Sequence, residues 1–268
     1  IEGYNSLHLP CELGHENIVK ILLQTDVNIN HQDKDGDTPL MIASYHGFKN
    51  IIQILLKKNA DLNLQNKKGD TALMKAAYGN HFEVVRLLVE KGAKLNITSK
   101  DNYSALSFSM SKNNKEMTTY LINAGENRIP LKAKELNPML LNVCKQGDIE
   151  LVQLFIDNGA DKNYIDKSIE GAGNTPLMLA STNNHLEIVK ILIDNDVDLN
   201  LQNSHKCTPL WSASMHGHID MVKLLLENGA NPNIQIGEDK ITVLFSVAGK
   251  RFDETDIYVT TKKNLDSN

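Results

Sequence analysis

The chain has 268 residues, of which 41% are hydrophobic and 5% aromatic; its formal charge is -5 and its isoelectric point lies near 6.0. The acidic balance opposes a general electrostatic role with nucleic acid, which requires a basic face. The longest apolar runs are far shorter than the roughly 20 residues that a helix needs to cross a bilayer, so no membrane span is predicted. Three cysteines without a short pairing pattern argue against a secreted disulfide scaffold and favour an intracellular, cytoplasmic location.

One leucine recurs along the chain at nearly constant spacing. The first three steps are 33 residues, and the later ones are 34, 37, 33 and 34. A fixed period of this length indicates a solenoid of stacked repeats. The recurring leucines are Leu7, Leu40, Leu73, Leu106, Leu140, Leu177, Leu210 and Leu244.

The most regular copy of the unit covers residues 35–63 and predicts two helices. Thr38 offers a side-chain oxygen to a helix start, and Pro39 follows at the first helical position, where its missing amide costs nothing. This helix is expected to stop at Gly47. A second helix with a wide apolar stripe follows and ends at Asn59.

The seventh residue after each of the first seven leucines is glycine or asparagine, the types that adopt the left-handed conformation most easily. We therefore predict that each ends a first helix. Left-handed residues are also expected after the second helices, at glycines or, less favourably, at two aspartates. The first set is Gly14, Gly47, Asn80, Asn113, Gly147, Asn184 and Gly217; the second is Gly92, Gly125, Gly159 and Gly229, with Asp26 and Asp196.

This unit resembles the ankyrin repeat, whose motif reads roughly D-x-x-G-x-T-P-L-H-x-A, then G-H-x-E-V-V-x-L-L-L, then G-A-D-V-N. The resemblance extends from residue 1 to about 250 and implies an all-α solenoid of helix-turn-helix units with projecting β-hairpin-like loops. The core motif stands at residues 38–40, 175–177 and 208–210. The motif histidine survives only as His8, and methionine at positions such as Met41 suggests apolar packing in its place.

In chain order, we assign ankyrin repeats one to four to residues 1–126, with Pro10 expected to bend the first helix. Residues 127–137, which contain Pro130, lack the loop pattern and form an irregular loop and a possible seam, either a kink or a flexible joint. Repeats five to seven and the start of an eighth occupy 138–250, with extra loop residues around 168–173. Residues 251–268 form a tail or a partial C-terminal cap.

No catalytic constellation is visible: there is no phosphate-binding glycine loop, paired-cysteine metal pattern or HExxH helix. The spacing of His216–His218 is metal-like, but it is better interpreted as the turn between two helices of a repeat. Cys11 and Cys144 are predicted to be buried thiols, and Cys207 an exposed one in a loop. We expect no catalytic residue, no cofactor and no metal.

The remaining candidate is a surface that binds a protein partner. In the family, partners usually contact the concave side, which the first helices and the projecting loops form. Tyr45 and Tyr78 occupy the same outward position of neighbouring first helices, flanked by His46, and Tyr103 joins them from a loop. Large rigid rings with hydrogen-bonding tips are typical of binding hot spots. The alternative is that these tyrosines only shield loops. Trp211, Met215 and His216 form a second candidate.

We therefore expect a non-enzymatic, monomeric scaffold that binds a protein through this side. The alternative is a targeting arm of a larger enzyme or channel, because Ile1 is not an initiator methionine and the sequence reads as a piece of a longer protein; a removed signal peptide also explains that residue. A catalytic site on the repeats is a remote third hypothesis. By resemblance, Asn63 and Asn200 are similar to loop asparagines that some ankyrin repeats offer to an oxygen-dependent hydroxylase, although loop-fixing hydrogen bonds explain them better.

Overall fold

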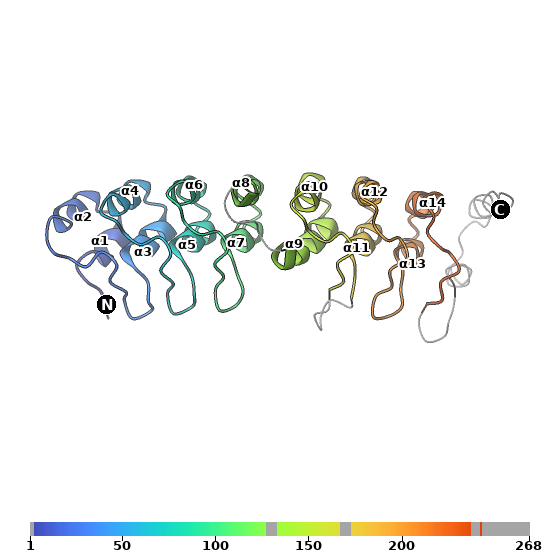
Figure 1. Cartoon of the computed structure of the whole chain (residues 1–268), viewed down its shortest axis with the longest axis horizontal. Helices are drawn as coiled ribbons and strands as arrows, with labels where there is room; N and C mark the ends of the chain where they lie inside the picture. The colour runs from blue at the N-terminus through green and yellow to red at the C-terminus, as the bar shows by residue number, and fades with distance from the viewer. Residues whose placement is uncertain (1–2, 127–132, 167–172, 237–241, 243–268) are drawn as a thin grey trace. The chain divides into compact units, whose positions relative to one another are not determined.

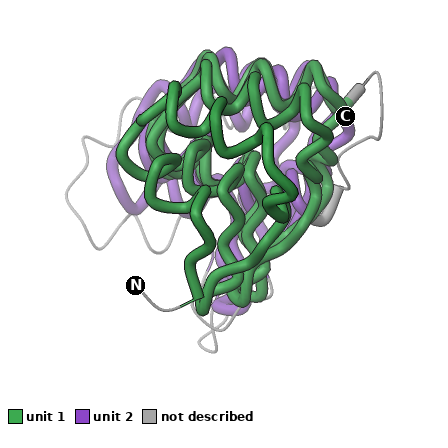
Figure 2. Tube along the Cα trace, turned by 90° about the vertical axis from the view of Figure 1, so that its left-hand side faces the viewer, with its two compact units in different colours: residues 1–131 green, residues 132–268 purple. Residues whose placement is uncertain are grey.

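The fold was examined in a computed structural model, which describes residues 3–126, 133–166, 173–236 and 242. Within these ranges the regular segments are all α-helices, and in each part of the chain they form successive helix pairs joined by projecting loops (Figure 1). The predicted all-α solenoid is therefore confirmed. The chain divides into two compact units, residues 1–131 and residues 132–268 (Figure 2).

Unit 1 contains four helix pairs, one for each of the first four repeats. In each pair the first helix lies nearer the projecting loops (Figure 1). The pairs are α1 (His8–Leu13) with α2 (Glu16–Leu22), α3 (Pro39–His46) with α4 (Lys49–Lys57), α5 (Ala72–Tyr78) with α6 (Phe82–Glu90), and α7 (Ala105–Ser111) with α8 (Lys115–Glu126).

Unit 2 contains three described helix pairs. Its repeats follow the same order of first helix, turn, second helix and loop. The pairs are α9 (Ala133–Gln146) with α10 (Ile149–Asp157), α11 (Pro176–Thr182) with α12 (Leu186–Asp194), and α13 (Pro209–Met215) with α14 (Ile219–Glu227).

The core of each unit is a row of apolar contacts between neighbouring repeats. The first helix α3, for example, packs against α1, α4 and α5. The recurring leucine lies at the centre of these contacts, and it is at most 2% exposed in every described repeat. The buried leucines are Leu7, Leu40, Leu73, Leu106, Leu140, Leu177 and Leu210.

The predicted helix starts and turns are present. The Thr38 hydroxyl oxygen accepts a hydrogen bond from the Met41 amide at 3.2 Å, and the threonines and serine at four equivalent positions cap their helices in the same way. All seven glycine or asparagine positions predicted to end a first helix have positive φ, from 54° at Asn113 to 88° at Gly147. The turn chemistry read from the sequence is thus confirmed.

The predictions for the second-helix ends are confirmed at four positions, because Gly92, Gly159, Gly229 and Asp196 have positive φ. They are wrong at Gly125, which lies buried inside α8, and at Asp26, which is not among the residues with positive φ. Glycine permits the left-handed conformation without requiring it, and aspartate adopts it only at a steric cost.

The start of repeat five also differs from the prediction. Residues 133–137 were expected to belong to an irregular loop, but they form the first turns of α9, and Pro138 lies inside that helix. Burial of Leu136 and Asn137 holds these turns in place. In addition, Asn137 Oδ1 accepts a hydrogen bond from the Asp161 amide at 2.8 Å, which ties α9 to the following loop.

The bend predicted at Pro10 stays a prediction. Helix α1 begins at His8, two residues later than its counterpart α3, which agrees with the backbone donor that proline lacks. Another single-residue prediction is wrong. Cys207 was predicted to be exposed, but it is buried, with 7% of its surface accessible. Its amide donates a hydrogen bond to Asn203 Oδ1 at 2.9 Å, which holds the residue against the loop.

Several predictions fall outside the described residues. These are the details around Pro130, the extra loop residues at 168–172, the eighth repeat around Leu244 and the tail at 251–268.

We expect stability to be distributed along the stack. Leu88 in α6 is fully buried, so Leu88→Ala should lower the free energy of unfolding by about 2–5 kcal/mol. Hydrogen exchange should show the loss of protection mainly in repeats two to four, because each repeat contacts only its neighbours. Equal loss of protection from the first helix to the last would contradict this.

A second prediction concerns His8, the retained motif histidine. His8 is buried, its Nε2 lies 3.2 Å from the Asp37 carbonyl oxygen in the next loop, and burial lowers its pKa below the ordinary value of about 6.5. Between the folded and unfolded pKa values the unfolded chain binds more protons. Stability should therefore be complete above about pH 6.5 and fall as the pH drops below it. The free energy of unfolding of His8→Gln, measured with urea at several pH values, should lack this fall below about pH 6.5. Identical pH profiles for the variant and the parent chain would refute the prediction.

Candidate functional site

Two exposed tyrosines stack on each other at the ends of neighbouring first helices. Tyr45 lies in the last turn of α3 and Tyr78 ends α5, and their ring centroids are 6.0 Å apart with an interplanar angle of 19°. The two side chains are 43% and 46% exposed. The structure thus brings together the two residues that the sequence placed on one surface.

Tyr103 joins this pair through Phe108 in α7. The Phe108 ring meets Tyr78 edge-on with centroids 5.4 Å apart, and it stacks on Tyr103 at 5.4 Å and 18°. We call Tyr45, Tyr78, Phe108 and Tyr103 the aromatic stripe. Tyr103 is 48% exposed, so three tyrosines of the stripe face solvent.

Phe108 is the member that sequence reasoning missed. It stands two residues after the recurring leucine, at the position equivalent to Lys75 in the preceding repeat, whereas only positions five and six were considered as outward. The sequence did contain a signal for Phe108, because an aromatic residue stands there at the position where the neighbouring repeat has a lysine.

Two further side chains border the stripe. The His46 ring meets Tyr45 edge-on at 5.1 Å and stacks on Phe48 at 5.8 Å. The Lys112 ammonium lies 4.2 Å from the centre of the Tyr78 ring, a cation–π geometry. His46 therefore contacts the Tyr45 end of the stripe, and Lys112 contacts Tyr78 in its middle.

His81 from the next turn fixes the backbone beneath the stripe. Its Nε2 lies 2.9 Å from the Tyr45 carbonyl oxygen. The ring is so close to Gly47 that a Cβ there would lie 2.5 Å from Nδ1, and a Cβ at Gly79 would lie 2.5 Å from the Tyr45 carbonyl oxygen. Glycine at both positions lets the His81 ring and the backbones of the two repeats approach closely.

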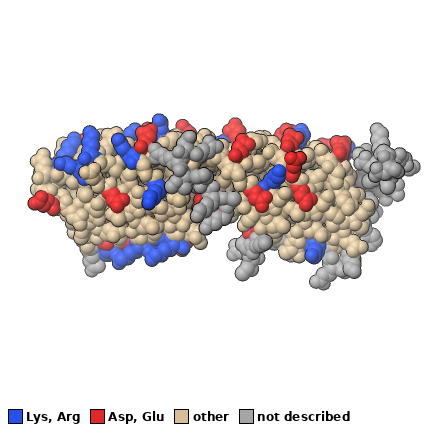
Figure 3. Space-filling view, viewed as in Figure 1, with Lys and Arg blue, Asp and Glu red and all other residues tan. Residues whose placement is uncertain are grey.

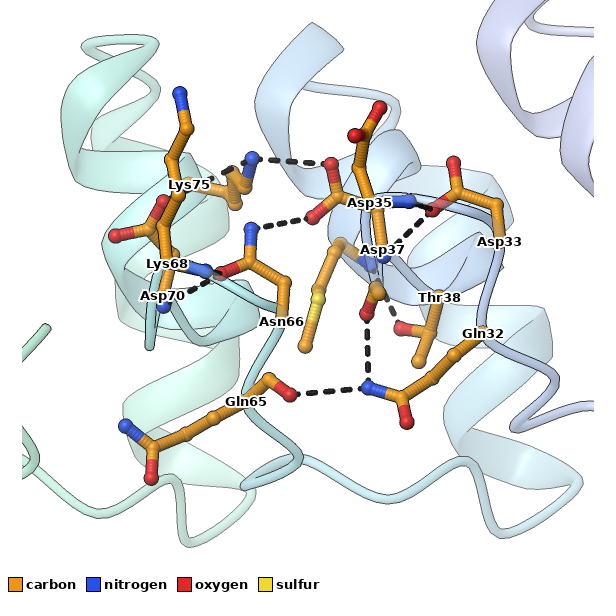
Figure 4. A network of polar contacts seen from close by, with 12 residues as sticks. Gln32, Asp33, Asp35, Asp37, Thr38, Gln65, Asn66, Lys68, Asp70 and Lys75 are labelled. Atoms are coloured by element: carbon orange, nitrogen blue, oxygen red, sulfur yellow. Dashed lines mark hydrogen bonds and ion pairs between the residues drawn. The ribbon is translucent and has the colours of Figure 1, made fainter. Parts of the chain in front are cut away.

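A polar network occupies the loops beside the stripe (Figure 4). Asp37 accepts from Asn66 Nδ2 at 2.7 Å and pairs with the Lys75 ammonium at 3.1 Å, and Asp70 lies 3.9 Å from the same ammonium. These charged side chains are at most 20% exposed. The network joins the loops of repeats two and three from within.

The second predicted candidate lies in unit 2. Trp211 and Met215 are half-buried on α13, and His216 is exposed. His216 stacks on His218 with centroids 5.7 Å apart, and its Nδ1 lies 2.8 Å from the Ser212 carbonyl oxygen. Nε2 of His218 lies 3.0 Å from the Thr182 carbonyl oxygen. These histidines thus stabilise the turn between two helices, as the sequence interpretation proposed.

The loop asparagines make the hydrogen bonds expected of them. Asn63 Oδ1 accepts from the Lys94 amide at 2.9 Å, and Asn200 Oδ1 accepts from the Asn231 amide at 2.8 Å. Each asparagine therefore links its loop to the next repeat.

The described residues hold no cluster of three histidine, cysteine, aspartate or glutamate side chains that could bind a metal ion. Burial raises the pKa of the Cys11 and Cys144 thiols to about 12, so neither forms a thiolate readily near neutral pH. Among the helices described here, none is both long and apolar enough to traverse a lipid bilayer.

Comparison with known proteins agrees with the repeat architecture. The family described as "Ankyrin repeats (3 copies)" matches residues 2–66, 58–131 and 140–236, which is most of the chain. The chain belongs to the ankyrin repeat family. This confirms the resemblance on which the sequence interpretation rested.

Similar proteins match only in part. The "Palmitoyltransferase AKR1" of Debaryomyces hansenii is 38% identical over 28% of this chain and 10% of its own length. The "Ankyrin repeat and SAM domain-containing protein 6" of Mus musculus is 34% identical over 25% of this chain and 7% of its own length, and the Rattus norvegicus protein gives the same values. The aligned part of this chain thus spans a tenth or less of each of these relatives.

The contact between Gly47 and His81 yields a testable prediction. Gly47→Ala and Gly92→Ala both place a side chain at a positive φ, which costs roughly 1–2 kcal/mol. Only Gly47→Ala also drives a methyl group into the His81 ring, since nothing lies within 4 Å of a Cβ at Gly92. Gly47→Ala should therefore lower the unfolding temperature more; equal losses would show that the ring yields freely.

Proposed function

We propose that the chain is a non-enzymatic scaffold that binds a protein partner through the first helices and projecting loops of unit 1, with the aromatic stripe at the centre. The observation that carries this proposal is the stack of exposed rings across three neighbouring repeats. Exposed aromatic side chains that form a continuous group are typical of protein interfaces.

The stacking itself favours binding. A free tyrosine loses rotamer freedom when it enters an interface, which lowers affinity by about 0.5–1.5 kcal/mol for each immobilised side chain. Tyr45 and Tyr78 already contact each other across two repeats, and Tyr103 already contacts Phe108 within repeat four. Their hydroxyl tips can donate to or accept from a partner, while the ring edges contribute apolar area.

We propose that the chain is non-enzymatic because the polar residues that group together in it form contacts that hold the loops in place. Asp37 and Lys75 contact each other and neighbouring loop residues, and the His81 ring is in contact with the backbone of another repeat. Such groups are engaged in holding the scaffold. The overall charge of -5 supports a protein partner rather than nucleic acid. We also propose a monomeric protein with an intracellular, cytoplasmic location, which its three free cysteines suit.

A second function follows from the comparisons. The similar proteins are much longer than the segment that matches, and one of them is named a palmitoyltransferase. The repeats would then be the targeting arm of a larger enzyme or channel, binding a partner or substrate through the same stripe. The full open reading frame distinguishes the two functions, because only the second requires a further domain.

The test of the binding surface is a triple substitution. Replacing Tyr45, Tyr78 and Tyr103 together by alanine should weaken binding of a partner recovered by pull-down by at least about 2 kcal/mol, roughly 30-fold. The reason is the loss of pre-ordered ring area. Affinity can be measured by isothermal titration calorimetry.

The matched control replaces the same three residues by phenylalanine, which keeps the rings and removes the hydroxyl groups. Circular dichroism should show unchanged helix content in both variants. A partner that binds the alanine variant as tightly as the parent chain would place the site elsewhere.

A further inference from the structure

A row of lysines runs along the tips of the projecting loops in unit 1 and borders the aromatic stripe. Figure 3 shows these basic side chains gathered along the lower edge of that half of the molecule. All of them are exposed. We call Lys34, Lys67, Lys68 and Lys100 the lysine row.

Backbone hydrogen bonds hold the loop tips side by side. The Lys67 amide donates to the Asp35 carbonyl oxygen at 2.9 Å, and the Lys100 amide donates to the Lys68 carbonyl oxygen at 2.8 Å. Gly36 makes this approach possible, because a Cβ there would lie 2.7 Å from the Lys67 nitrogen. The backbone therefore sets the spacing of the row.

Nearby carboxylates neutralise the row only in part. Asp33 Oδ1 accepts from the Asp35 and Asp37 amides at 2.9 and 2.8 Å, and Asp37 and Asp70 are engaged with Lys75. The exposed carboxylates at the tips are Asp35 and Asp101. The four lysines of the row outnumber the two exposed aspartates beside them, so positive charge prevails at the exposed loop tips. The half-buried Asp33, Asp37 and Asp70, with Lys75, bring the total formal charge of these loops to zero.

The lysine row and the aromatic stripe meet in one turn. Lys100 and Tyr103 belong to the same loop, where the Ser99 amide donates to the Tyr103 carbonyl oxygen at 2.8 Å. Lys112 adds a second exposed ammonium beside the stripe, over Tyr78. Exposed rings and exposed positive charge thus form one continuous surface.

We propose that this surface selects an acidic peptide segment of a protein partner. The carboxylates of the segment would lie opposite Lys67, Lys68 and Lys100, and its apolar or hydrogen-bonding side chains would lie against the tyrosines. This inference rests on the proposed function and adds the chemical class of the partner. Complementary charge at the edge of an interface guides encounter and excludes partners of the wrong sign.

A single-stranded nucleic acid is the main competitor, since such ligands also use basic residues and aromatic rings. Their bases stack on free ring faces. Here Tyr45 and Tyr78 each have one face stacked on the other, Tyr103 has one face stacked on Phe108, and Lys112 lies over Tyr78. These rings therefore offer fewer free faces to bases than unstacked rings would, while their hydroxyl groups and exposed edges suit a peptide.

The experiment uses random 12-residue peptides displayed on phage and selected on the immobilised full chain. Selected peptides should be enriched in aspartate and glutamate. A fluorescein-labelled selected peptide should bind Lys67→Gln/Lys68→Gln/Lys100→Gln on the order of tenfold more weakly at low salt, and the difference should shrink as salt is added. The matched control is Lys57→Gln/Lys58→Gln/Lys91→Gln, which removes the same charge from exposed lysines near the second-helix ends and should bind normally.

The outcomes distinguish the two proposals. Peptides that require the three tyrosines but carry no excess of acidic residues, or that bind both lysine variants equally, would refute the acidic class and leave the binding surface standing. Peptides that bind the triple tyrosine-to-alanine variant as tightly as the parent chain would refute the proposed function itself. Failure to enrich any acidic peptide also counts against the inference. A further refuting result would be binding of a 15-nucleotide uridine oligomer or of phosphatidylserine vesicles in place of acidic peptides, if the lysine-row variant loses that binding.

Discussion

The whole structure depends on the burial of one apolar face of each helix pair by the next pair. A single pair is too small to bury its own leucines, so neighbouring repeats cover them. Leu40 lies between two repeats, and Leu7 in the first repeat is covered by the second. This contact is local in sequence and repeats every 33 residues or so. The requirement explains why the scaffold positions are nearly constant while the outward positions vary.

The period made much of the fold predictable. Left-handed residues at seven turns, threonine caps and buried leucines are each determined within one repeat, so the same reasoning holds wherever the pattern is intact. The predictions failed where the repeat pattern weakens. Gly125 is absorbed into α8, and α9 begins before Pro138, because packing of residues such as Leu136 overrides the local signals. Cys207 follows a loop tip in sequence but packs inward, which composition alone does not reveal.

The candidate site was predictable only in part, for a related reason. Tyr45 and Tyr78 share a position in the repeat, so the period places them on neighbouring helices. The contacts that turn them into one surface depend on ring orientation and on residues outside that position. Phe108 bridges to Tyr103, and His81 supports the Tyr45 carbonyl from the next turn.

Comparison of repeats three and four shows how one backbone can carry different surfaces. In repeat three, Lys75 reaches the Asp70 carboxylate and joins the loop to the first helix. At the equivalent positions of repeat four, Phe108 and Tyr103 stack and make the same connection. The charged pair is largely shielded, whereas the aromatic pair leaves Tyr103 48% exposed. Replacing a charged pair by rings therefore preserves the link between loop and helix and adds area for a partner, without any change in the helices that stack beneath it.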